Sequence, residues 1–155
     1  MSQTATLAEP TAQQTEYFDV VIVGAGISGV GGAYHLQQQC PGKSFVVLDA
    51  LESFGGTWLT HTYPGIRSDS DLHTFGYRFK PWIGPPIATA EEIRKYLNDV
   101  IEENGLKEAI RYSTKLSRCS WSSADKKWTV ETVNEDGSPG QTYRCNFMWM
   151  CQGYY

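Results

Sequence analysis

Apolar residues form two short, uninterrupted runs in the first third of the chain. Asp19–Val23 and Ser44–Asp49 are rich in valine, and neither alternates between apolar and polar positions. Strands of a parallel sheet that is covered on both faces show this pattern. Between them, apolar residues at helical spacing follow Gly26 and continue to Cys40-Pro41-Gly42, where proline and glycine end a helix. The order strand, glycine turn, helix, strand predicts an α/β fold.

The middle of the chain has a different pattern. From residue 50 to residue 86, glycine and proline recur at short intervals with aromatic residues between them, and no period is sustained. A loop this long in a compact domain is usually functional, so we expect it to wrap a ligand. Thr89 and Glu92 then form a capping box, and apolar residues at helical spacing follow until Gly105. This pattern predicts a helix that packs by one face.

The last third of the chain contains several short β-prone segments. They are Ile110–Tyr112, Leu116–Trp121, Trp128–Val133 and Thr142–Cys145, with a turn signal at Asp136-Gly137. Together they predict a small antiparallel meander. Phe147–Cys151 is again apolar without alternation, as for a strand that returns to the parallel sheet. We therefore expect an α/β domain over residues 17–155, with a parallel sheet, helices and a small antiparallel meander.

Composition and charge narrow the possible partners. The chain has 155 residues, 41% of them hydrophobic, a formal net charge of −4 and a pI near 5.3. Nucleic acids and anionic membranes require clustered Lys and Arg, so neither is expected, and no apolar run approaches the roughly 20 residues that span a bilayer. Residues 1–16 are rich in Thr, Gln and Ala and lack the features of a secretory signal, which predicts a disordered tail and a cytoplasmic protein.

The cysteines and histidines do not form a metal-binding pattern. Four cysteines occur without a CxxC pair, which predicts reduced, mostly buried thiols. His35, His61 and His73 lie on unrelated predicted elements, and a zinc site needs ligands that converge. We expect no metal site.

The segment Gly24-Ala25-Gly26-Ile27-Ser28-Gly29 fits the pattern GxGxxG between a predicted strand and a predicted helix. In this motif the first glycine permits a tight turn, the second lets the backbone approach a pyrophosphate, and the third lets helix and strand pack closely. The unpaired N–H groups of the helix would face the phosphates, and Ser28 can add a hydroxyl. Asp49 ends the second strand where an acid binds ribose hydroxyls. These features predict an adenine dinucleotide and leave FAD and NAD open.

The segment after Asp49 favours FAD. An NAD domain would continue through a helix to a third parallel strand, whereas this chain runs into Gly55-Gly56-Thr57-Trp58 and then Tyr63–Asp71, with the sequence YPGIRSDSD. With Leu72–Phe79, these motifs closely resemble the start of class B flavoprotein monooxygenases. The chain is most similar to bacterial Baeyer-Villiger monooxygenases of the ethionamide-activating subfamily, and the resemblance covers nearly all of residues 17–155. It implies a Rossmann-like FAD/NAD(P)-binding domain with a parallel sheet, helices and a small antiparallel meander.

The resemblance implies roles for individual residues. The Gly55-Gly56 turn allows close backbone approach to a flat ring, and Gly56 is assigned to the cofactor. Arg67, Ser68 and Asp69 would lie where the isoalloxazine ring meets the nicotinamide nucleotide, with Asp69 as the catalytic candidate. The pyrophosphate would be held by Gly24, Gly26, Ser28 and Gly29, the ribose by Asp49, the flavin by Thr57, Trp58, Leu59 and Thr60, and the adenine end by Leu116.

Two details keep alternatives open. Arg67 could instead form a structural ion pair at the surface with Asp69 or Asp71. Such pairs contribute little to stability and do not indicate a binding site. Asp49 stands where FAD-binding members of this group often carry Glu, and Asp is the usual choice in NAD domains.

In such enzymes a reduced nicotinamide cofactor, usually NADPH, passes hydride to FAD. Oxygen is then inserted beside a ketone carbonyl to give an ester or lactone, or a sulfide is oxidised. Complete members are several times longer and carry a second glycine motif, so the resemblance implies that this chain is an incomplete, inactive FAD-binding portion. The alternatives are a flavin N- or S-monooxygenase and a non-catalytic dinucleotide-binding module.

Overall fold

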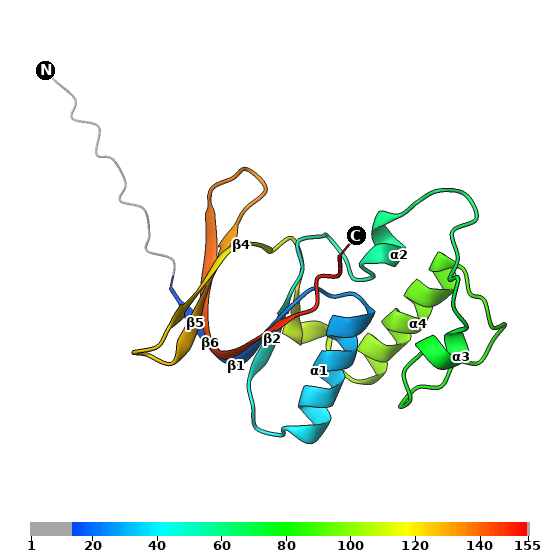
Figure 1. Cartoon of the computed structure of the whole chain (residues 1–155), viewed down its shortest axis with the longest axis horizontal. Coiled ribbons are helices and arrows are strands. Elements are labelled where there is room, and N and C mark those ends of the chain that lie inside the picture. The colour runs from blue at the N-terminus through cyan, green and yellow to red at the C-terminus, as the bar shows by residue number, and fades with distance from the viewer. Residues whose placement is uncertain (1–13, 155) are drawn as a thin grey trace, which may run out of the picture.

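The computed structural model describes residues 14–154, and its centre is one six-stranded mixed sheet (Figure 1). The strand order is β3-β2-β1-β6-β5-β4. β1 pairs in parallel with β2 and β6, β2 pairs in parallel with β3, and β4, β5 and β6 pair antiparallel in succession. The strands are β1 (Glu16–Val23), β2 (Phe45–Leu48), β3 (Ile110–Arg111), β4 (Lys115–Ser122), β5 (Lys127–Val133) and β6 (Pro139–Met150). The Rossmann-like fold with an antiparallel meander is confirmed.

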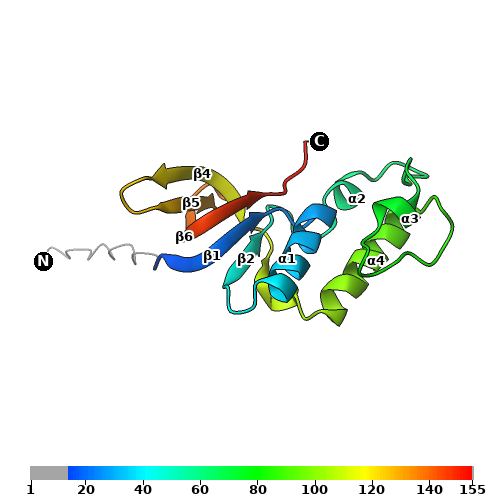
Figure 2. The ribbon, with the colours of Figure 1, turned by 60° about the horizontal axis from the view of Figure 1, so that its bottom comes forward.

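Two long helices cover one face of the parallel strands. α1 (Ile27–Gln39) lies against β1 and β2, and α4 (Ala90–Glu103) lies next to α1, farther from the sheet (Figure 2). α4 begins with the predicted capping box, in which the Glu92 backbone N–H donates to the Thr89 hydroxyl and the Thr89 backbone N–H donates to the Glu92 carboxylate. Both predicted helices are therefore confirmed.

The core is divided by the sheet. On the helical face, Val20 and Ile22 of β1 pack with Val30 of α1 and with Leu97 and Val100 of α4, all buried. The opposite face is covered by the meander, whose buried members are Val130, Tyr143 and Cys145. β1 and β2 are thus covered on both faces, which explains their unbroken apolar sequences.

Some predictions of elements are wrong. Thr142–Cys145 and Phe147–Cys151 were expected as two strands, but both lie in β6, which pairs with β5 through its first half and with β1 along most of its length. Ile110–Arg111 does not join the meander and pairs with β2 at the other edge of the sheet. Glu16 begins β1 rather than ending a tail, and the predicted disorder of residues 1–13 lies outside the described residues.

The long loop contains two single-turn helices, α2 (Thr57–Thr60) and α3 (Leu72–Phe75), that the sequence did not predict. Four residues are too few to show a helical period. Asp71 caps α3, because its carboxylate accepts a hydrogen bond from the His73 backbone N–H at 2.7 Å. The loop is anchored by an apolar cluster of Leu72, Ala88 and Ile93. It therefore packs onto α4 as part of the fold.

Candidate functional site

A cavity of about 550 Å³ opens at the carboxyl ends of β1, β2 and β6. In open α/β sheets this edge is where ligands bind. The lining residues come from the glycine motif, the end of β2, the Gly-Gly turn, the start of β4 and the segment after β6. They are Val23, Gly24, Gly26, Ile27, Ser28, Leu48–Leu51, Gly55–Trp58, Thr60, Thr114–Leu116 and Met150–Gly153.

The glycine motif is tightly packed against its neighbours. Gly24 has φ +107°, and a Cβ there would lie 2.5 Å from the Cys151 carbonyl oxygen. A Cβ on Gly29 would lie 1.8 Å from the Gly24 carbonyl oxygen. Only glycine fits at either position, as expected for a tight turn and a close helix–strand contact. Gly29 itself does not line the cavity.

The GxGxxG motif and the Gly55-Gly56 turn contact each other through their backbones. The Gly55 N–H donates to the Ala25 carbonyl at 3.1 Å, and a Cβ on Gly56 would lie 3.3 Å from the Gly26 Cα atom. Gly56 has φ +52°, a conformation that favours glycine. A Cβ on Gly26 would meet no protein atom closer than 3.7 Å, so the protein itself does not require glycine there. The space that a side chain would fill is the cavity.

The amino-terminus of α1 points its unpaired donors toward this space. Gly26 is the N-cap residue and supplies no side-chain cap, and the first turn carries no acidic residue. The first N–H groups of a helix lack partners within the helix and favour an anion. Ile27 and the exposed Ser28 line the cavity beside them. This end of α1 is suited to a phosphate group.

Asp49 is buried and hydrogen-bonded to backbone. Its Oδ2 accepts from the Ala25 N–H at 2.5 Å, and its Oδ1 accepts from the Leu51 N–H at 2.8 Å. The side chain, 7% exposed, therefore ties the end of β2 to the glycine motif. A carboxylate has about four acceptor positions, so two remain for hydroxyl groups in the cavity.

Four other predicted residues lie outside the cavity lining. Ser68 is buried, and its hydroxyl accepts from the Ala88 N–H at 3.2 Å. Asp69 is exposed and accepts from the Ser70 hydroxyl, and Arg67 donates to the Gly65 carbonyl. Leu59 does not line the cavity, and a Cβ on Gly55 would lie 3.2 Å from the Leu59 Cβ atom. Within residues 14–154 no ion pair joins Arg67 to Asp69 or Asp71. Their roles at a cofactor stay predictions.

Lys115, Cys151 and Gln152 are among the lining residues that the sequence analysis missed. Lys115 is exposed at the start of β4, and Cys151 and Gln152 follow β6. Among the described residues that line the cavity, Lys115 carries the one positive side chain and Asp49 the one negative. The apolar run before Cys151 could have predicted that Cys151 and Gln152 lie at the cavity. A strand that returns to a parallel sheet ends at the same edge as the glycine turn.

Other candidate chemistry is limited. Cys40 and Cys119 are exposed, so the prediction of mostly buried thiols is wrong for these two, whereas Cys145 is buried. Burial raises the pKa of the Cys145 thiol and of the Cys151 thiol.

Residues 14–154 contain no group of three or more His, Cys, Asp or Glu that could hold a metal ion. In the same part of the chain, no helix combines the length and apolar character needed to cross a bilayer.

Comparisons with known proteins agree with this geometry. The model of the NAD(P)-binding Rossmann-like domain matches residues 22–83. The chain is 49% identical over 91% of its length to the FAD-containing monooxygenase EthA of Mycolicibacterium smegmatis. Among solved structures, it is 29% identical to an oxidised steroid monooxygenase bound to NADP, with a TM-score of 0.78 over 88% of this chain. It is 26% identical to cyclohexanone monooxygenase from Rhodococcus sp. Phi1 bound to NADP+, with a TM-score of 0.78 over 90% of this chain.

These relatives are considerably longer proteins. The chain spans 28% of the length of the Mycolicibacterium protein and 26% of each of the two solved structures. Residues 22–83, which match the domain model, contain the GxGxxG motif, Asp49 and the Gly55-Gly56 turn.

Proposed function

The chain is homologous to the amino-terminal part of FAD-containing monooxygenases, and from this premise we propose that residues 17–155 form the FAD-binding part of a flavin-dependent, NADPH-dependent monooxygenase of the Baeyer-Villiger type. One observation carries the proposal: the glycine motif, the Gly-Gly turn and Asp49 converge on a single cavity at the amino-terminus of α1. The substrate of the whole enzyme would be a ketone or a sulfide. The resemblance to steroid and cyclohexanone monooxygenases supports the ketone.

The residues present fit FAD. The N–H groups at the start of α1 would bind the diphosphate, and Gly26 and Gly56 would let the two backbones approach it closely. Asp49 keeps two acceptor positions for the adenosine ribose, and Leu116 would contact the adenine. The chemistry that FAD supplies when bound is acceptance of hydride and activation of oxygen. The protein's part is to bind it, orient it and exclude water.

Thr57, Trp58 and Thr60 would lie along the flavin, because they line the cavity beyond Gly56. We place Leu59 with the flavin as well, and Arg67, Ser68 and Asp69 where the isoalloxazine ring meets the nicotinamide nucleotide. The exposed Asp69 could orient an arginine beside the cofactors, and it remains our catalytic candidate.

A second candidate is a dinucleotide-binding module specific for NAD. Two observations favour it: Asp49 is the acid usual in NAD domains, and the matching domain model is one for NAD(P).

Gly26→Ala tests the proposal most directly. The added methyl group meets no protein atom closer than 3.7 Å, so the fold should persist while the approach of a diphosphate is blocked. After incubation with FAD and desalting, the wild-type protein should keep flavin absorbance, and Gly26→Ala should bind FAD at least roughly tenfold more weakly. Gly32→Ala is the control, since its Cβ would lie 3.5 Å from the Trp149 ring, away from the cavity.

Titration calorimetry with FAD, NAD and AMP separates the two candidates. Binding of FAD that Gly26→Ala weakens and Gly32→Ala preserves supports the flavoprotein. A colourless protein that binds NAD but not FAD would instead support the second candidate.

A further inference from the structure

The sequence of α1 gives the first turn of this helix little intrinsic stability. The helix ISGVGGAYHLQQQ carries three glycines, at positions 29, 31 and 32, and glycine disfavours a helix relative to alanine. Its N-cap residue makes no side-chain cap, and no acidic residue complements the helix dipole in the first turn. The turn whose N–H groups border the cavity therefore needs support from elsewhere in the fold.

Tyr77, from the far end of the long loop, supplies a contact at this turn. Its hydroxyl donates to the carbonyl of Ile27, the first residue of α1, in a short hydrogen bond. Its ring lies so close to Gly31 that a Cβ there would be 2.8 Å from the ring. Burial raises the pKa of Tyr77, as does the nearby Tyr96, while a hydrogen bond from the Gly31 backbone N–H acts in the opposite direction. The hydroxyl thus stays protonated and contacts both Ile27 and Gly31.

Tyr77 is itself held from the other side. Its backbone N–H donates to the Tyr96 hydroxyl of α4 at 2.8 Å, and the Tyr96 hydroxyl donates to the Lys80 carbonyl at 2.6 Å. Its ring stacks on Phe79 with the ring centres 4.7 Å apart, and Phe79 stacks on Tyr34 of α1. The side chain therefore has a fixed position relative to both helices.

We propose that Tyr77 is a positioning residue for the dinucleotide site: its hydroxyl holds the first turn of α1 so that the N–H groups of Ile27 and Ser28 face the cavity. This inference rests on the proposed function. Ile27 and Ser28 line the cavity, whereas Tyr77 does not. Tyr77 therefore acts on the ligand through the helix and not by contact.

Tyr77→Phe tests the hydroxyl alone, because the ring and its stacking are kept. We expect the dissociation constant for FAD to rise roughly fivefold, the effect of losing one hydrogen bond. Tyr34→Phe is the matched control, since it removes a hydroxyl from the same aromatic stack and no hydrogen bond of that hydroxyl occurs in residues 14–154. Equal FAD affinity for Tyr77→Phe and the wild type would overturn the inference.

Amide hydrogen exchange distinguishes positioning from general stability. Tyr77→Phe should speed exchange at Val30 and Gly31, and leave Val47 in β2 and Leu97 in α4 unchanged. Uniformly faster exchange, or no change at Val30 and Gly31, would contradict the proposal. If the wild-type protein fails to bind FAD, the proposed function fails, while the exchange at Val30 and Gly31 still decides whether Tyr77 holds the turn.

Discussion

Backbone N–H groups hold two buried polar side chains, Asp49 at the cavity and Ser68 in the long loop. Asp49 was predicted from its position after the second strand, and it lies in the cavity. The sequence could not show that its carboxylate accepts from the Ala25 and Leu51 N–H groups, because such bonds depend on how β2 and the glycine motif pack. The same holds for Ser68, whose hydroxyl accepts from Ala88 across the loop.

The glycine positions give a prediction at the residue scale. Gly29→Ala would place its Cβ 1.8 Å from a backbone oxygen that cannot move freely, so we expect a loss of about 2 kcal/mol or more in the free energy of unfolding. Gly26→Ala should change it by less than about 1 kcal/mol, since its nearest protein atom is 3.7 Å away. Urea titrations followed by circular dichroism measure both. Equal stability of the two variants would contradict this difference in packing.

At the scale of elements, the sequence predicted those with a sustained pattern. α1 and α4 were predicted from apolar residues at helical spacing, and β1 and β2 from unbroken apolar runs. β6 was divided in two because the polar Asn146 interrupts its apolar run. β3 was assigned to the meander because two residues carry no information about their partner strand. Strand pairing is decided by contacts distant in sequence, which a local pattern does not contain.

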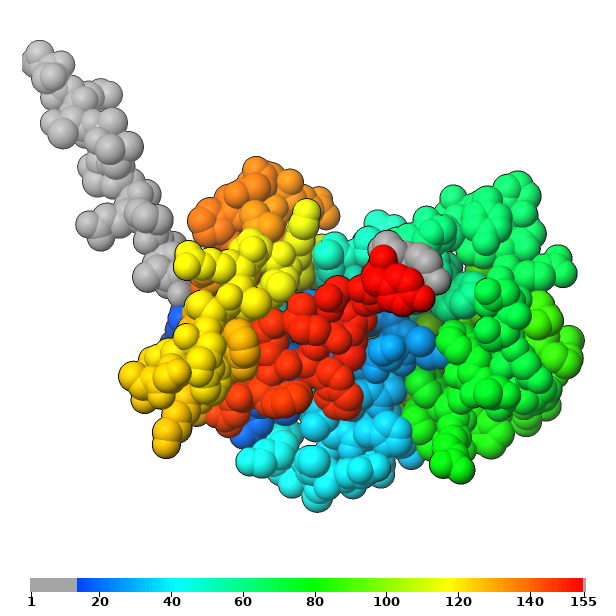
Figure 3. Space-filling view, in the orientation of Figure 1, coloured from blue at the N-terminus to red at the C-terminus, as the bar shows by residue number. Residues whose placement is uncertain are grey.

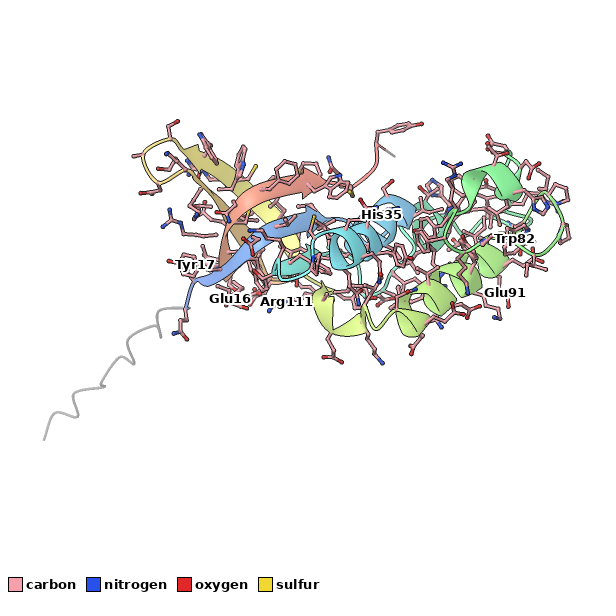
Figure 4. All side chains as sticks on the ribbon, turned by 90° about the horizontal axis from the view of Figure 1, so that it is seen from below. Glu16, Tyr17, His35, Trp82, Glu91 and Arg111 are labelled. Carbon is pink, nitrogen blue, oxygen red and sulfur yellow. The ribbon has the colours of Figure 1, made fainter. Side chains whose placement is uncertain are left out.

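One ion pair joins two strands of the sheet, because Arg111 of β3 donates to both carboxylate oxygens of Glu16 in β1, at 2.6 and 2.7 Å (Figure 4). Arg111 also donates to the Tyr143 hydroxyl of β6 at 3.0 Å. The hydrogen bond from Arg111 holds the pKa of Glu16 below its usual value of 4.5. The pair therefore links three strands of the parallel part of the sheet.

This pair predicts a pH dependence of stability. Because the folded pKa of Glu16 is lowered, its contribution is complete above pH 4.5 and is lost as the pH falls through the folded value. Both side chains are more than a third exposed, so solvent screening limits the effect to about 1 kcal/mol. Thermal unfolding between pH 3 and 7 should show a smaller acid-side loss for Glu16→Gln.

Glu91→Gln is the control for this measurement. Glu91 is exposed on α4, and the described residues include no ion pair to it. An unchanged acid-side slope in Glu16→Gln would mean that the pair adds nothing to stability.

At the scale of the whole molecule, one apolar surface remains uncovered. From residue 146 to residue 150, β6 pairs with β1 on one side, and no strand within residues 14–154 pairs with its other edge. Phe147 is 58% exposed and Met150 45%. Figure 3 shows this part of β6, in red, at the surface between the β4–β5 hairpin and α1. An open strand edge with apolar side chains favours pairing with another chain.

We therefore expect the chain of 155 residues to self-associate as its concentration rises. Phe147→Lys should reduce association, because a charged side chain at a strand edge opposes pairing. Ile83→Lys is the control, since Ile83 is 95% exposed on the long loop, away from β6. Sedimentation velocity measures the mass of each protein. A monomeric wild-type protein, or equal effects of the two variants, would contradict association through β6.

The pairing of β1 with β6 also sets an order for folding during synthesis. β1 is made before every other strand of the sheet and can pair with β2, which follows after a single helix. Its other partner, β6, is the last strand of the sheet to be made, so one edge of β1 stays unpaired until the other strands of the sheet within residues 14–154 have been made. Contacts so distant in sequence form slowly, and until they form the unpaired edge of β1 is exposed to other nascent chains. Newly made protein is therefore most dependent on chaperones in this interval.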